Sequence, residues 1–86
     1  MNTYKLVIST PDGSVFDGEA AAIIVRGTEG ELSVMAGHIP FITAVKPSKC
    51  KIVLHDESEK TATIGGGILT VQNNVTTLLC SDFEWN

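Results

Sequence analysis

The sequence predicts an all-β fold, either a sandwich or a barrel of about nine short strands in one domain. Apolar residues alternate with polar ones along most segments, and turn residues recur at roughly 8–10-residue spacing. No stretch shows the period of an amphipathic helix. The chain has 86 residues, of which 43% are hydrophobic. This length supports one small core and leaves no room for a cofactor domain beside a substrate domain.

The expected strands of the first third are separated by short turns. Residues 4–8 alternate as in a strand with one buried face, and Pro11-Asp12-Gly13 follows as a turn, because Pro presets φ and Gly accepts positive φ. Val15-Phe16 is expected to be a short strand that ends at a second turn, Asp17-Gly18. Residues 20–26 end in β-branched side chains, so we expect a strand covered on both faces at that end.

The remaining strands are expected between loops rich in Gly, Pro, Asn and charged residues. These loops are the segments 27–31, 37–40, 46–48, 56–60, 65–67 and 73–74. Asn73-Asn74 should close a tight hairpin, since Asn tolerates positive φ. Cys50 is in phase with Ile52 and Leu54, so we predict a small core residue, whereas the pattern leaves Cys80 open.

The charge balance excludes some classes of partner. Six Lys and Arg stand against ten Asp and Glu, for a net charge of −4, which argues against binding nucleic acid. Lys46, Lys49 and Lys51 are interpreted as a solvated strand face. The sequence shows no signal-peptide pattern and no apolar run near the ~20 residues of a membrane span. We therefore expect no direct membrane insertion, and a chain that is cytosolic or held at a membrane by a protein partner.

Few residues are suited to catalysis or metal binding. His38, His55, Cys50 and Cys80 could supply zinc ligands only if the fold gathered them, and no CxxC or HxxxH pair begins such a site. A Cys–His catalytic pair would need a base close to one thiol, and nothing in the sequence supports one. We expect no catalytic residue, no metal and no cofactor.

Two glycine-containing loops could be functional. Gly65-Gly66-Gly67 is followed by an apolar strand instead of the helix that a phosphate loop requires. We interpret Gly65, Gly66 and Gly67 as structural, marking a bulge or a close approach of neighbouring backbone. Glu29 and Glu31 lie in a wet, glycine-bounded loop, which favours recognition or solubility over acid–base catalysis.

Several motifs occur in an order that identifies a family. They are Val25-Arg26-Gly27-Thr28-Glu29-Gly30-Glu31-Leu32, Gly37-His38-Ile39-Pro40, Thr43-Ala44-Val45-Lys46-Pro47 and Ile64-Gly65-Gly66-Gly67-Ile68-Leu69-Thr70-Val71. Over nearly the whole chain they resemble the epsilon subunit of F-type ATP synthases. The resemblance implies that residues 1–86 form the family's N-terminal domain, a two-sheet β-sandwich of about ten short strands.

The resemblance also implies a function. By resemblance, we expect a non-catalytic rotor subunit of the central stalk. Such a subunit binds the gamma subunit, contacts the c-ring and couples proton or other ion flow to ATP synthesis. By resemblance, the c-ring-facing loop is Thr28, Glu29, Gly30 and Glu31, and the gamma-facing residues are Ser9, Thr10, His38 and Thr43. The expected location is peripheral, on the cytoplasmic face of a bacterial plasma membrane as part of the complex.

Some features depart from the family pattern. Ser33, Ala36 and Ser48 replace Gly and Pro residues that are common there, and Cys80 stands near a usual acidic position. Many members continue into a two-helix hairpin that restrains ATP hydrolysis. This sequence stops at Asn86, so inhibition and nucleotide binding are not carried over.

Two other hypotheses come from different functional classes. A small all-β carrier or adaptor module would present a modifiable Lys at a hairpin tip, commonly next to Met. Lys60 is the candidate, although no Met flanks it. An enzyme that uses His38 with Cys50 or Cys80 rests on residue types alone.

Overall fold

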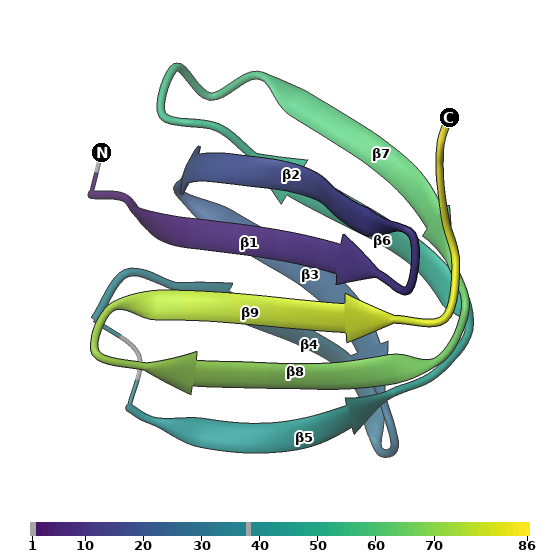
Figure 1. The fold of residues 1–86 in the computed structure, drawn as a ribbon. Helices are drawn as coiled ribbons and strands as arrows, with labels where there is room; N and C mark the ends of the chain where they lie inside the picture. Colours follow the sequence, from purple (N-terminus) through teal and green to yellow (C-terminus); the bar gives the residue numbers. More distant parts are fainter. Residues whose placement is uncertain (1, 38) are drawn as a thin grey trace.

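Figure 1 shows a computed structural model of the chain, which describes residues 2–37 and 39–86. This part of the chain is all β, as predicted. The ten strands are β1 (Tyr4–Thr10), β2 (Gly13–Ala20), β3 (Ala22–Gly27), β4 (Gly30–Met35), β5 (Phe41–Val45), β6 (Ser48–Val53), β7 (Glu59–Ile64), β8 (Gly67–Gln72), β9 (Val75–Cys80) and β10 (Phe83–Trp85).

The strands form two layers that are hydrogen-bonded to each other along one edge. The first sheet has the order β5-β8-β9-β1-β2 and the second has the order β4-β3-β6-β7-β10. The ladder between them consists of one residue pair, Gly27 of β3 with Val45 of β5. Beside it, the amide of Lys46 donates to the carbonyl of Arg26 at 2.8 Å. The predicted two-sheet β-sandwich is confirmed, and its connected edge makes it nearly a barrel.

Both sheets bury alternate residues between them. On β1, Tyr4, Leu6 and Ile8 are buried, whereas Lys5 between them is exposed. The largest fully buried side chains come from both layers and are Leu6, Ile8, Ile23, Ile52, Ile64, Leu69 and Leu78. Burying each such side chain contributes roughly 1.5–3 kcal/mol. The hydroxyl of Tyr4 also donates to the carbonyl of Val34 at 2.7 Å, which ties β1 of the first sheet to β4 of the second.

Two expectations for the first third of the chain are wrong. The turn expected at Asp17-Gly18 is absent, because pairing with Val7 and Leu6 of β1 keeps both residues extended within β2. The strand over residues 20–26 was expected to be covered on both faces at its β-branched end. The continuously buried segment lies instead at 20–23, and Ile24 is only half-buried. There the chain passes from the first sheet to the second, and the Ala21 amide donates to the Val53 carbonyl at 2.7 Å.

The hairpin predicted at Asn73-Asn74 is confirmed. Both residues have positive φ, of 52° and 60°, and connect β8 to β9 in a two-residue turn.

The Gly65-Gly66-Gly67 segment carries the chain from β7 in the second sheet to β8 in the first. A Cβ atom on Gly65 would clash with the Ser81 hydroxyl, and one on Gly67 would clash with the carbonyl oxygen of Leu79. At Gly66 the nearest atom would be 3.5 Å away, an ordinary contact. Close approach of neighbouring atoms therefore explains the first and third glycines.

Candidate functional site

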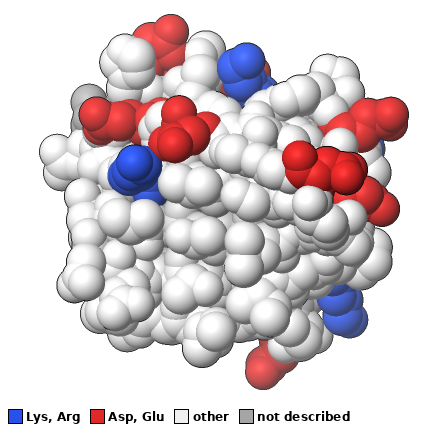
Figure 2. Space-filling model, in the orientation of Figure 1, with Lys and Arg blue, Asp and Glu red and all other residues white. Residues whose placement is uncertain are grey.

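The outer face of the first sheet carries no charged side chain on β5, β8 or β9. The β8–β9 register places Ile68 opposite Leu79 and Thr70 opposite Thr77, all on the side away from the core. The outward residues of this surface, termed the uncharged face, are Ile42, Ala44, Ile68, Thr70, Thr77, Leu79, Val7 and Ser9. In Figure 2 the centre of this side is white, and most charged side chains lie at the rim.

Three large apolar side chains stand out from the uncharged face. Ile42 is 69% exposed, Ile68 is 47% exposed and Leu79 is 52% exposed. Ile68 and Leu79 are cross-strand neighbours, and Ile42 on β5 is diagonal to Ile68. Contiguous exposed apolar side chains mark interaction surfaces in soluble proteins. This geometry suits docking of another protein.

Of the residues that the resemblance assigned to the gamma side, the structure describes Ser9 and Thr10 at the end of β1 and Thr43 on β5. Ser9 lies on the uncharged face, paired with Leu79. Thr10 ends β1, and its hydroxyl accepts the amide of Asp12 at 3.2 Å in the following turn. Thr43 is half-buried and shares the inward side of β5 with its partner Leu69. His38 lies outside the described residues.

Sequence reasoning missed the apolar residues of the uncharged face. The available signal was the strand 67–72, where apolar Ile68 occupies a position out of phase with buried Leu69 and Val71. An apolar residue at an outward position indicates a covered surface. The pattern of one strand does not reveal that the neighbouring strands also carry apolar residues at outward positions.

The loop assigned to the c-ring side forms a two-residue hairpin turn between β3 and β4. Gly27 pairs with Gly30, whose φ of 121° requires glycine, and Thr28 and Glu29 are exposed at the tip. A shallow hollow of about 200 Å³ lies beside this loop, and Thr43 is one of its lining residues. The structure therefore brings Thr43 to this loop. Figure 1 shows the turn at the lower right, next to the end of β5.

The thiols are unsuited to nucleophilic chemistry. Cys50 is buried in the core, as predicted, and Cys80 is also buried. Burial raises the pKa of the Cys50 thiol to about 12 and also raises the pKa of Cys80. A thiol that stays protonated at neutral pH is a poor nucleophile, so this arrangement does not favour the enzyme hypothesis.

The other candidate groups are dispersed. His55 is exposed in the turn after β6. Within residues 2–37 and 39–86, no group of three His, Cys, Asp or Glu side chains could hold a metal ion. The same residues contain no helix that could cross a membrane.

The carrier hypothesis requires a Lys at a hairpin tip, and Lys60 does not lie at one. It is the second residue of β7, and its ammonium group is 5.2 Å from the centroid of the Trp85 ring. The connection between β6 and β7 is residues 54–58, where the Asp56 carboxylate accepts hydrogen bonds from the hydroxyl and amide of Ser58.

Comparison with solved structures shows that this fold occurs in ATP synthases. A chain in the Euglena gracilis mitochondrial ATP synthase (OSCP, F1 and c-ring) superposes with a TM-score of 0.91 at 22% identity, covering 96% of this chain and 53% of that one. A chain in the Tetrahymena thermophila mitochondrial ATP synthase (central stalk and c-ring) gives a TM-score of 0.76 at 20% identity, covering 92% and 63%.

Curated sequences are similar at higher identity. The "ATP synthase epsilon chain, sodium ion specific" of Acetobacterium woodii is 36% identical over 83 residues, 96% of this chain and 62% of that one. The ATP synthase epsilon chain of Delftia acidovorans is 39% identical over 79 residues, 92% of this chain and 57% of that one. The chain thus spans about three-fifths of the length of these relatives.

The sequence model of one family matches residues 3–86, almost the whole chain. That family is described as "ATP synthase, Delta/Epsilon chain, beta-sandwich domain". The all-β sandwich described above agrees with this description. The chain therefore belongs to the family of ATP synthase delta/epsilon chain β-sandwich domains.

Proposed function

We propose that this chain is a non-catalytic rotor subunit of the central stalk of an F-type ATP synthase. It binds the gamma subunit through the uncharged face and contacts the c-ring through the loop Thr28–Glu31. Together these two contacts couple ion flow to ATP synthesis. It works peripherally at the cytoplasmic face of a bacterial membrane, held there by protein partners.

The observation that carries the gamma-binding proposal is the uncharged face. Permanent subunit interfaces are more apolar at their centre than the rest of a protein surface, and their polar and charged residues lie at the rim. Ile42, Ile68 and Leu79 provide such a centre, surrounded by hydroxyl-bearing and small side chains. Lys5, Asp17 and Glu19 provide a charged rim along the β1–β2 edge.

The c-ring contact is supported by the position of the β3–β4 turn. The turn lies at one end of the sandwich, with Thr28 and Glu29 exposed at its tip. The fold also matches a chain in the central stalk and c-ring assembly of the Tetrahymena thermophila enzyme and a chain in the OSCP, F1 and c-ring assembly of the Euglena gracilis enzyme. In this arrangement one protein meets two partners, one through the uncharged face and the other through the turn.

Co-expression with the gamma subunit of the same organism, followed by size-exclusion chromatography at micromolar concentration, tests the proposal. The two proteins are expected to co-elute. Ile68→Glu should weaken binding about 100-fold, because it places a charge at the apolar centre of the interface. Met35→Glu is the matched control, since Met35 is 59% exposed but lies on β4 of the second sheet.

Two results would contradict the proposal. One is the failure of the unmodified proteins to co-elute. The other is full retention of gamma binding by Ile68→Glu together with an unchanged thermal unfolding temperature, because that combination would show that the uncharged face is not the docking surface.

A further inference from the structure

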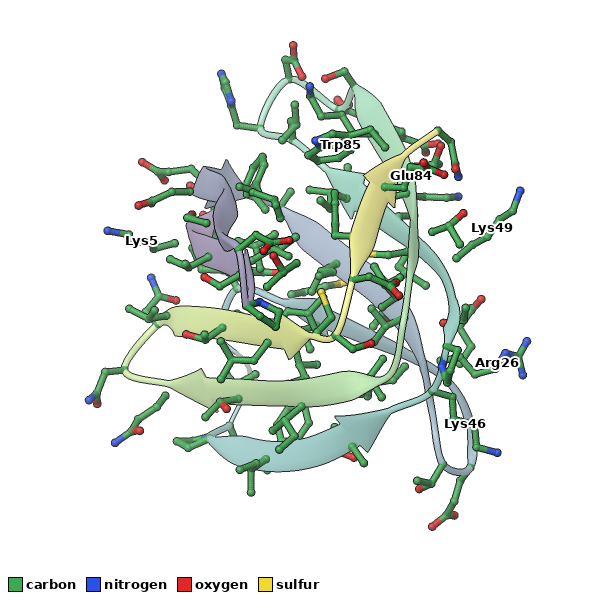
Figure 3. The ribbon with its side chains drawn as sticks, turned by 45° about the vertical axis from the view of Figure 1, so that its right-hand side comes forward. Lys5, Arg26, Lys46, Lys49, Glu84 and Trp85 are labelled. Atoms are coloured by element: carbon green, nitrogen blue, oxygen red, sulfur yellow. The ribbon has the colours of Figure 1, made fainter. Side chains whose placement is uncertain are left out.

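Three of the six basic side chains have neither an acidic partner nor an aromatic one, and they lie along one side of the molecule. Lys5 pairs with Asp17 at 3.7 Å, Lys51 pairs with Glu59 at 3.8 Å, and Lys60 lies over the Trp85 ring. Among the described residues, the three cations that form neither an ion pair nor a contact with an aromatic ring are Arg26, Lys46 and Lys49. Figure 3 shows them along one side of the molecule, directed away from its body. They are termed the basic edge.

The backbone brings these cations together from different strands. β3 pairs with β6 only from Ala22 to Ile24 and then leaves it to meet β5 at Gly27. A hollow of about 300 Å³ opens where the two strands separate, and Arg26 and Lys49 are among its lining residues. Lys46 is held beside Arg26 by the bond from its amide to the Arg26 carbonyl.

Carboxylates adjoin the basic edge. Glu31 is opposite Arg26 in the β3–β4 ladder and also lines the hollow, and Glu29 follows at the exposed turn. A uniformly anionic lipid surface would be attracted by the cations and repelled by these carboxylates. A protein surface with complementary charges satisfies both signs, so the arrangement selects a protein partner.

We propose that the basic edge binds an acidic side chain on the protein surface that faces the loop Thr28–Glu31, with its carboxylate between Arg26 and Lys49. Arginine suits this role, because its planar guanidinium can donate two parallel hydrogen bonds to one carboxylate. The inference rests on the proposed function, since it takes the partner surface to be the exposed loops of the c-ring.

The test uses the complex of this chain with gamma, and measures its association with detergent-solubilised c-ring from the same organism by biolayer interferometry. The double variant Arg26→Gln/Lys49→Gln is expected to bind about 10-fold more weakly, mostly through slower association, and to show a weaker dependence on salt. Lys60→Gln is the matched control, because it removes a positive charge at a distance from the basic edge. It should bind as the unmodified complex does.

The outcomes separate this inference from the proposed function. If the complex with gamma forms but does not bind the c-ring, the c-ring part of the proposed function fails. If it binds the c-ring and the double variant binds equally well, only the present inference is overturned. Vesicles of phosphatidylcholine and phosphatidylglycerol form the last arm. Binding to them that the double variant loses, without a change in c-ring binding, would identify lipid as the occupant and overturn the proposal.

Discussion

The two outer faces of the sandwich differ sharply, although the two sheets share one core. The first sheet presents the uncharged face, whereas the second sheet presents charges on most of its strands. The outward charged residues of the second sheet are Arg26, Glu31, Lys49, Lys51, Glu59 and Glu84. The inward positions of both sheets are mostly apolar, so the difference lies chiefly at positions that the core does not constrain. We infer that the outward residues of each sheet suit the surroundings of that face.

The comparison also bears on how a domain with an exposed apolar surface limits contacts between its own copies. The charged outer face of the second sheet and the net charge of −4 limit association between copies of this chain through that side. The uncharged face remains available to a partner. The two requirements are met by opposite sides of the same molecule.

The largest expected effect comes from disturbing the Gly65-Gly66-Gly67 crossover, where the chain passes from the second sheet to the first. Gly67→Ala should lower the free energy of unfolding by about 3 kcal/mol or more, because the new Cβ would clash with the backbone of β9. Gly66→Ala is the matched control and should change stability by less than about 1 kcal/mol, since its Cβ has room. Urea denaturation of both variants checks this. Equal effects would show that the crossover tolerates side chains at both positions.

A second prediction concerns the buried core that the two faces share. It tests whether the Cys50 thiol in this core titrates as a buried group. Burial raises the pKa of Cys50 from about 9 to about 12 in the folded state. The folded protein therefore keeps a proton that the unfolded chain releases, so stability is full below pH 9 and falls as pH rises toward 12. The loss is about 1.4 kcal/mol per pH unit in that window.

Tyr4 and Cys80 also have raised pKa values, and their titration adds to the alkaline loss. The Cys50→Ala variant isolates one contribution, because its stability should fall less steeply above pH 9 than that of the unmodified protein. Urea midpoints measured at several alkaline pH values provide the comparison. Parallel curves for the two proteins would mean that the Cys50 thiol is not protected by the fold.

The smallest expected effect concerns the ion pairs, one on each outer face. Lys5→Gln removes the pair with Asp17 on the first sheet, and Lys51→Gln removes the pair with Glu59 on the second. Both pairs are largely exposed, so each variant should change the free energy of unfolding by less than about 0.5 kcal/mol. Thermal unfolding at low and high salt measures this. A loss above about 1.5 kcal/mol for either variant would show that surface charge, beyond its role in recognition, holds that sheet together.

Much of the fold was predictable from local pattern. Alternation along residues 4–8 indicates the inward face of β1, and Asn73-Asn74 indicates a hairpin, because both signals depend on residues adjacent in the chain. The expected turn at Asp17-Gly18 failed for the converse reason. Turn-forming residues remain extended when a neighbouring strand pairs with them, and that neighbour is specified elsewhere in the sequence.

The sequence by itself determined the all-β class, the inward position of Cys50 and the ordered motifs of the family. Only the tertiary structure decided that Ile42, Ile68 and Leu79 share one face, that Thr43 lies beside the β3–β4 turn, and that Arg26 lines a hollow with Lys49. Strand order and register set these neighbours, including the parallel pairing of β1 with β9. Such pairings depend on how whole strands bury their faces together, and a local pattern carries no record of which distant strand will lie alongside.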